Sequence, residues 1–141
     1  MKKQRPVIIS GGQHVDVRGV VRFNNAVNLE QVKRMYTIEN SSLAVVRAWQ
    51  GHQVEQRWFA AVKGDFKIIV AAIDTWPKPS RDIKQVTFIV KAAQLDVLHV
   101  PAGYLTSIQQ LEENATLIVY ADYGLGAIND ECKLDAAYFN D

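Results

Sequence analysis

One histidine stands in a segment of amide and aromatic side chains that could line a reaction site. The segment Arg47–Gln56 has Gln50 and Gln56 on either side of His52, and Thr106 follows a Pro-Ala-Gly turn further along. A neutral amide is a poor ligand for a transition metal, and such sites usually take three or more protein ligands. We therefore expect a site that works by acid–base chemistry or binding without a metal.

Histidine is suited to proton transfer near neutral pH because its ordinary pKa is about 6.5. Gln50 can donate a hydrogen bond but cannot take up a proton. His52 is our candidate base, although a histidine that is merely hydrogen-bonded inside a β pocket is the alternative. His99 stands in an apolar stretch, which indicates a structural role, and His14 is expected at the surface.

Three arginines are candidates for binding a phosphorylated ligand. Guanidinium groups bind phosphate in a bidentate manner, which favours Arg18, Arg34 and Arg47 for that role. Ordinary salt bridges are the alternative, because the chain has 16 Lys and Arg against 15 Asp and Glu. The balance gives a net charge of +1, so the sequence lacks the excess of positive charge that is typical of proteins that bind nucleic acid.

Length and composition predict one globular domain spanning residues 1–141. Apolar residues make up 48% of the chain and charged residues 22%, as in ordinary globular proteins. The apolar run after the basic start is only Val7–Ile9, too short for a signal peptide or a membrane span. We expect a cytoplasmic protein with no membrane partner. Cys132 is the only cysteine, so no internal disulfide can form.

Short β-rich segments recur between turns and predict an all-β sandwich or barrel. Only residues 130–139 carry helical periodicity, so we expect a short C-terminal helical or irregular segment. The predicted strands are roughly 6–9, 19–23, 31–38, 44–50, 55–62, 66–73, 84–90, 95–100, 105–110 and 115–122.

Strand parity predicts which side chains share a face. In one strand Arg34 and Tyr36 lie on the same side, and in another Gln50 and His52 do. By the same parity Arg47 points the opposite way from His52, unless a bulge near Gly51 resets the phase.

Four segments, in this order, resemble the nucleotide-sugar 3,4-ketoisomerases and WxcM-like proteins, relatives of the dTDP-4-dehydrorhamnose 3,5-epimerases. They are Asp16–Gly19, Val32–Tyr36, Arg47–Gly64 and Leu117–Tyr123, and the resemblance covers about residues 14–135. It implies a single cupin (jelly-roll) barrel, commonly a homodimer that exchanges a strand. It also implies a nucleotide-linked 4-keto-6-deoxyhexose substrate, dTDP-linked in those relatives, for polysaccharide or glycan synthesis, with no metal or organic cofactor.

The resemblance also assigns roles to individual residues. His52 matches the second histidine of the family's Arg-Gly-x-His-x-His segment, and Gln50 replaces the first. Tyr36 is expected to assist His52 in catalysis. Arg18, Arg34, Arg47, Gln50 and Gln56 are the expected substrate-binding residues.

The replacement of a histidine by Gln50 bears on the reaction. Epimerisation at two carbons needs a base on one face of the sugar and a proton donor on the other. A 3,4-ketoisomerisation moves a proton between adjacent carbons through an enediol, which one imidazole could serve. We therefore predict a ketoisomerase with His52 as base. The alternatives are a non-catalytic cupin that binds sugar nucleotides and a 3,5-epimerase-type enzyme.

Overall fold

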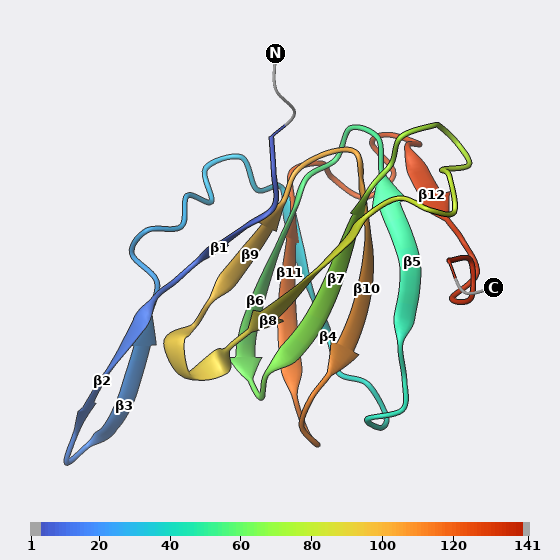
Figure 1. Cartoon of the computed structure of the whole chain (residues 1–141). Helices are drawn as coiled ribbons and strands as arrows, with labels where there is room; N and C mark the ends of the chain where they lie inside the picture. The colour runs from blue at the N-terminus through green and yellow to red at the C-terminus, as the bar shows by residue number, and fades with distance from the viewer. Residues whose placement is uncertain (1–3, 140–141) are drawn as a thin grey trace.

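Two antiparallel β-sheets face each other and form the body of the molecule (Figure 1). The structure is a computed structural model that describes residues 4–139. The first sheet contains, in spatial order, β1 (Val7–Ile9), β9 (Val97–Val100), β6 (Arg57–Lys63), β11 (Thr116–Ala121) and β4 (Arg34–Ile38).

The second sheet begins, at one edge, with a strand from near the C-terminus. Its spatial order is β12 (Glu131–Lys133), β5 (Arg47–His52), β10 (Tyr104–Gln110), β7 (Phe66–Ala72) and β8 (Gln85–Val90). A separate two-stranded arm, β2 (Gly12–Asp16) and β3 (Gly19–Phe23), projects from the body (Figure 1).

The main core lies between the two sheets because alternate residues of each strand point inward. Phe66, Ile68, Leu98 and Leu117 are fully buried there. Burial of such side chains is the main stabilising term for a domain of this size. One end of this core gives way to polar residues, and there the candidate site lies.

The outer faces of both sheets are also covered. Val27 and Val32, from the segment before β4, pack over Trp58 on the first sheet. On the second sheet, Trp49 packs against the C-terminal Phe139, with ring centroids 5.0 Å apart. The segment between β3 and β4 and the C-terminal segment therefore cover the outer faces of the two sheets.

An irregularity in β5 decides which of its side chains face inward. Along β10, Thr106 pairs with Gln50 and Ile108 with Arg47, so three steps on β5 match two on β10. An extra residue of this kind resets the alternation of side chains. Arg47 therefore shares the inner face with Gln50 and His52, which is the exception to strand parity that a bulge near Gly51 was expected to produce. The shift lies before Gly51, between residues 47 and 50.

The all-β prediction is confirmed, and the strands match the predicted segments closely. Two strands were not predicted: β2, whose start at Gly11-Gly12 resembles a turn, and β12. The helical periodicity of residues 130–139 produces a short strand and turns instead of a helix. Within residues 4–139 the only helical element is a 3₁₀ turn at Ala92–Gln94, and the sheets do not close into a continuous barrel.

In the described part of the chain, no helix has the length and apolar character needed to span a membrane.

The close approach of β5 and β10 at Gly51 gives a test of this packing. A methyl group added at Gly51 would lie 2.4 Å from the carbonyl oxygen of Tyr104, so the strands would have to separate. We expect Gly51→Ala to lower the free energy of unfolding by about 1–3 kcal/mol, the usual cost of overpacking. Gly124→Ala is the control, because no atom lies within 4 Å of its added methyl. Equal stability of the two variants in urea unfolding would contradict the packing described here.

Candidate active site

His52, at the end of β5, is held by a carboxylate from the other end of the chain. Its Nδ1 lies 3.1 Å from Oδ1 of Asp130, and the histidine is 7% exposed. The other oxygen of Asp130 accepts the backbone N–H groups of Val54 and Glu55 at 2.8 and 2.7 Å. Asp130 is therefore fixed by the turn that follows β5, and it fixes the imidazole ring in turn.

Arg57 determines which nitrogen of His52 carries the proton. Its guanidinium donates to Nε2 of His52 at 2.9 Å. Arginine only donates, so Nε2 must accept and the ring proton must lie on Nδ1, directed at Asp130. This is the tautomer that a general base needs, with the basic nitrogen on the side away from its orienting carboxylate.

The same guanidinium connects His52 to Tyr36 on the opposite sheet. Arg57 donates from its second terminal nitrogen to the Tyr36 hydroxyl. Tyr36 lies on β4 and Arg57 on β6, whereas His52 lies on β5 of the second sheet. The line Asp130–His52–Arg57–Tyr36 therefore spans the space between the sheets.

Glu55 brings a second carboxylate to this group. Its Oε2 lies 3.4 Å from Nδ1 of His52, and its Oε1 lies 3.3 Å from Arg57 and 3.7 Å from Arg34. The buried carboxylate of Glu55 therefore faces two guanidinium groups, as a buried charge requires, whereas Asp130 is held by His52 and backbone N–H groups.

The donor set could be considered for a cation. One ligand atom from each of His52, Glu55 and Asp130 falls within 4.8 Å of the others. Arg57 and Arg34, however, already provide positive charge opposite Glu55, and Asp130 already accepts from His52 and two backbone N–H groups. The charge balance therefore favours proton chemistry at His52, and the expected absence of a metal stays a prediction.

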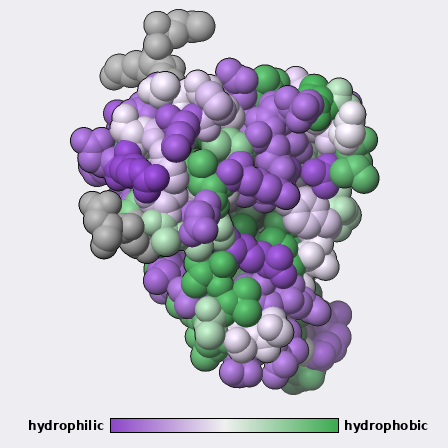
Figure 2. Space-filling model, turned by 90° about the vertical axis from the view of Figure 1, so that its right-hand side faces the viewer, coloured by the Kyte–Doolittle hydropathy of each residue, from purple (hydrophilic) through white to green (hydrophobic). Residues whose placement is uncertain are grey.

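A cavity of about 320 Å³ opens beside this group, between β4 and β5. Its inner wall is apolar, with Phe59, Val100 and Ile108, whereas Gln50 and Thr106 supply polar groups. The space-filling view shows a hollow with apolar residues at its bottom (Figure 2). Such a space suits a sugar ring whose hydroxyl groups meet a few placed polar side chains.

A second, more polar cavity of about 190 Å³ lies on the other side of His52. It is lined by Arg34 and by the loop from Gly124 to Glu131. His52, Glu55 and Arg57 line both cavities, so they form the wall between them.

Not all residues predicted from the sequence are brought together. His52, Tyr36, Arg47 and Gln50 line the larger cavity. Arg34 instead lines the smaller one.

Gln56 and Arg18 lie elsewhere. Gln56 bonds Asp122 and His99 and does not line either cavity. His99 also stacks on Trp58 with ring centroids 4.9 Å apart, and burial lowers its pKa although Asp122 opposes this, in line with a structural role. Arg18 lies at the tip of the arm and pairs with Asp16 at 2.7 Å.

Arg57, Glu55 and Asp130 are site residues that the sequence analysis missed. Arg57 had a detectable pattern, because it alternates with Phe59 and Ala61 on the inward face of β6. A charged residue at an inward strand position needs a partner, which indicates a site. No such pattern surrounds Glu55 or Asp130 in the sequence.

Sequence comparisons do not place the chain in a family. No protein-family model matches it, and no curated protein sequence matches it.

Solved structures share its fold. A variant of the 3,4-ketoisomerase QdtA from Thermoanaerobacterium thermosaccharolyticum, in complex with TDP-4-keto-6-deoxyglucose, has a TM-score of 0.72 and 14% identity, covering 99% of this chain and 94% of that one. The TDP-quinovose 3,4-ketoisomerase WlaRB from Campylobacter jejuni has a TM-score of 0.67 and 15% identity, covering 99% and 100%. The rmlC epimerase of Mycobacterium tuberculosis has a TM-score of 0.74 and 17% identity, covering 96% and 73%. The resemblance drawn from the sequence is confirmed in the fold.

Asp130 makes the stability of the protein depend on pH. Burial alone would raise the pKa of Asp130, but hydrogen bonds from Glu55, His52 and Val54 outweigh it and lower the pKa. A lowered carboxyl pKa stabilises the fold above the unfolded pKa of about 3.9, and this contribution is lost as the pH falls through the folded pKa.

We expect Asp130→Asn to lower the free energy of unfolding at pH 7 by about 1–3 kcal/mol, because an NH2 group replaces one of the two oxygens that accept from His52, Val54 and Glu55. The gap from wild type should narrow as the pH falls below about 4. Urea unfolding at pH 7 and pH 3 measures both effects, with the exposed Asp82→Asn as control. A gap that stays constant with pH would contradict the assigned role of Asp130.

Proposed function

We propose that this protein is a metal-independent sugar-nucleotide isomerase that converts a 4-keto-6-deoxyhexose by proton transfer. The observation that supports this proposal is the hydrogen-bonded series Asp130–His52–Arg57–Tyr36. It combines an oriented base, His52, with two hydrogen-bond donors, Arg57 and Tyr36, at the wall of a cavity. We further propose that it acts in the cytoplasm in the synthesis of polysaccharide or glycan precursors.

The proposed reaction starts at the carbon next to the carbonyl. Nε2 of His52 takes the proton from C3, and the electron pair moves to the carbonyl oxygen at C4. Arg57 leaves Nε2 as the sugar enters and donates to this oxygen, which lowers the cost of the developing charge. The oxygen at C4 takes a proton from Tyr36 to give the enediol, and the oxygen at C3 gives its proton back to Tyr36. His52 returns its proton to C4, which leaves the carbonyl at C3 and a hydroxyl at C4.

Tyr36 supports the exchange of hydroxyl protons in this scheme. A phenol can donate to the oxygen at C4 and accept from the oxygen at C3. Its contact with Arg57 keeps it beside the same two oxygens. Because Tyr36 and His52 share one guanidinium, they approach the sugar from neighbouring positions. A shuttle between adjacent carbons is favoured over a 3,5-epimerisation because His52 is the imidazole that lines the cavity, and the amide of Gln50 adds no second base.

The proposed substrate is linked to a nucleoside diphosphate, most simply dTDP. One of the similar structures is a 3,4-ketoisomerase in complex with TDP-4-keto-6-deoxyglucose. A second is a TDP-quinovose 3,4-ketoisomerase. In this chain the apolar cavity wall suits a 6-deoxysugar, because such a sugar carries a methyl group.

A non-catalytic sugar-nucleotide-binding protein is the second candidate, and Gln50 favours it. Gln50 lines the cavity beside His52, and its amide donates to Glu131 at 2.6 Å. Because an amide cannot take up a proton, Gln50 adds no second base.

We also propose that the chain forms a homodimer through its arm. The arm exposes Val15, Val17, Val21 and Phe23, with Val17 fully exposed. A two-stranded ribbon is marginal on its own in water, and exposed apolar ribbons are commonly covered by a partner. Asn24 anchors the base of the arm by donating to the carbonyls of Ile9 and Leu95. The arm could then reach across and exchange with a second copy.

The role of His52 is tested by its replacement with asparagine. We expect His52→Asn to reduce turnover of TDP-4-keto-6-deoxyglucose by roughly 10²–10⁴, the usual effect of losing a positioned base. Binding should change by only a few-fold, because asparagine keeps a polar group at the wall. The measurement is exchange of solvent deuterium into the sugar, followed by NMR.

Two further variants sharpen this test. His14→Asn is the control, because the side chain of His14 is 67% exposed on the arm. Gln50→His should keep activity, because it introduces the residue type of the relatives. If wild type binds the sugar nucleotide but exchanges no proton, the enzyme proposal fails and the binding protein stands.

The dimer is tested by charge placed on the arm. Wild type at micromolar concentration should scatter light as a species of about twice the chain mass of 15.8 kDa. Val21→Asp should shift it toward monomer, since a buried unpaired charge is costly. Leu43→Asp, at another exposed apolar residue, should leave the dimer intact. A monomeric wild type would refute the proposal.

A further inference from the structure

The positive charges around the larger cavity differ in how far they are neutralised. Arg57 faces the buried carboxylate of Glu55, so its charge is matched. Arg47 lines the same cavity and makes no ion pair with any of residues 4–139. The unmatched charge of the cavity therefore lies toward the Arg47 end, away from the proton-transfer group.

Arg47 is held by a neutral residue, which orients it without cancelling its charge. Its Nε donates to Oδ1 of Asn40 at 2.7 Å. Asn40 is only 9% exposed, and its backbone N–H donates to the side chain of Gln110, which is 2% exposed. This contact engages Nε alone and leaves the two terminal nitrogens of Arg47 for a ligand. A guanidinium so oriented can meet a phosphate in a bidentate way.

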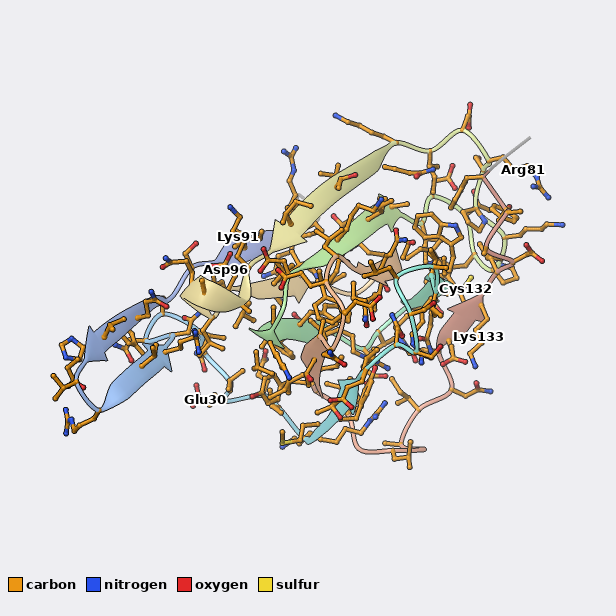
Figure 3. All side chains as sticks on the ribbon, turned by 90° about the horizontal axis from the view of Figure 1, so that it is seen from below. Glu30, Arg81, Lys91, Asp96, Cys132 and Lys133 are labelled. Atoms are coloured by element: carbon orange, nitrogen blue, oxygen red, sulfur yellow. The ribbon has the colours of Figure 1, made fainter. Side chains whose placement is uncertain are left out.

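Lys133 adds a second cation to the same cavity from β12. Glu131 and Lys133 pair with His52 and Gln50 on β5, so their side chains share the inner side of that strand. Figure 3 labels Lys133 on β12 at the edge of the second sheet. Its ammonium lies 3.3 Å from Glu131, but the Lys133 side chain is 71% exposed. Exposed pairs of this kind are weak, so a more highly charged anion can recruit the lysine.

We infer that Lys133 and Arg47 together bind the diphosphate of the substrate, with Asn40 as the residue that positions Arg47. This inference rests on the proposed function and deepens it. The sugar then lies at His52 and the diphosphate lies along β5 toward Arg47. Neither Lys133 nor Asn40 takes part in the proton transfer, so they determine affinity and leave the chemical step alone.

The experiment compares the binding of thymidine diphosphate and of thymidine by calorimetry. Lys133→Ala should weaken thymidine diphosphate binding by about tenfold, the usual scale for losing one charged contact. Thymidine binding should stay unchanged, because it has no phosphate. Lys84→Ala, at another exposed lysine outside both cavities, is the matched control and should change neither.

A double-mutant cycle tests Asn40. Asn40→Ala should weaken thymidine diphosphate several-fold in the wild-type background but have no further effect when Arg47 is already alanine. In turnover, KM should rise in Lys133→Ala and Asn40→Ala while kcat stays near wild type. A purely structural role for Asn40 would weaken binding in both backgrounds, which would overturn its positioning role.

The outcomes separate this inference from the function on which it rests. If wild type binds thymidine diphosphate and Lys133→Ala binds it equally well, the inference falls and the proposed function stands. If wild type binds no thymidine diphosphate and no sugar nucleotide, both fall together. Because Lys133 is exposed, its replacement carries little risk of unfolding the protein.

Discussion

The carboxylate of Asp130 is the contact on which the site depends. One of its oxygens accepts backbone N–H groups from the turn after β5 and so joins the C-terminal segment to that turn. The other oxygen accepts the Nδ1 proton of His52. Without it two backbone N–H groups and a buried imidazole would lose their acceptor, and buried polar groups without partners are costly. The residues after Asp130 form β12 on the edge of β5. The Asp130 side chain therefore joins the C-terminal segment to the turn after β5, precedes the strand that extends the second sheet, and orients His52.

Burial of charge imposes a second constraint on the same region. Glu55 is 6% exposed and Arg57 8% exposed, so each must keep a counter-charge nearby. If Arg57 moves to a substrate oxygen, Glu55 is left facing Arg34 at 3.7 Å. Arg34 can thus balance Glu55 while Arg57 is engaged by the substrate. In the proposed reaction, these paired charges allow the Arg57 guanidinium to leave the lone pair of His52 without stranding Glu55.

Much of the fold could be predicted because it rests on local patterns. Alternating apolar strands and intervening turns indicated the sheets, and His52 and Tyr36 were found by spacing and resemblance. The rest depends on contacts between distant residues. The hydrogen bond from His52 to Asp130 joins residues 78 positions apart, and no periodicity records it. The sequence allowed for a bulge in β5 near Gly51 but could not decide it, because the bulge is fixed by the register against β10, which puts Arg47 on the inner face.

Gln50 has a physical place in this arrangement that its sequence position alone does not reveal. A histidine there would have added a second titratable group beside His52. The amide instead donates to Glu131, the first residue of β12, and so ties the strand that carries Lys133 to β5. Glutamine at this position therefore provides no proton acceptor, and its hydrogen bond to Glu131 supports the edge of the sheet. A reaction that one imidazole can complete tolerates glutamine at position 50, whereas a reaction that requires a base at position 50 does not. The same reasoning explains why the alternative of pure binding remains chemically distinct: it needs the cavity and its cations but does not need the tautomer that Arg57 and Asp130 impose on His52.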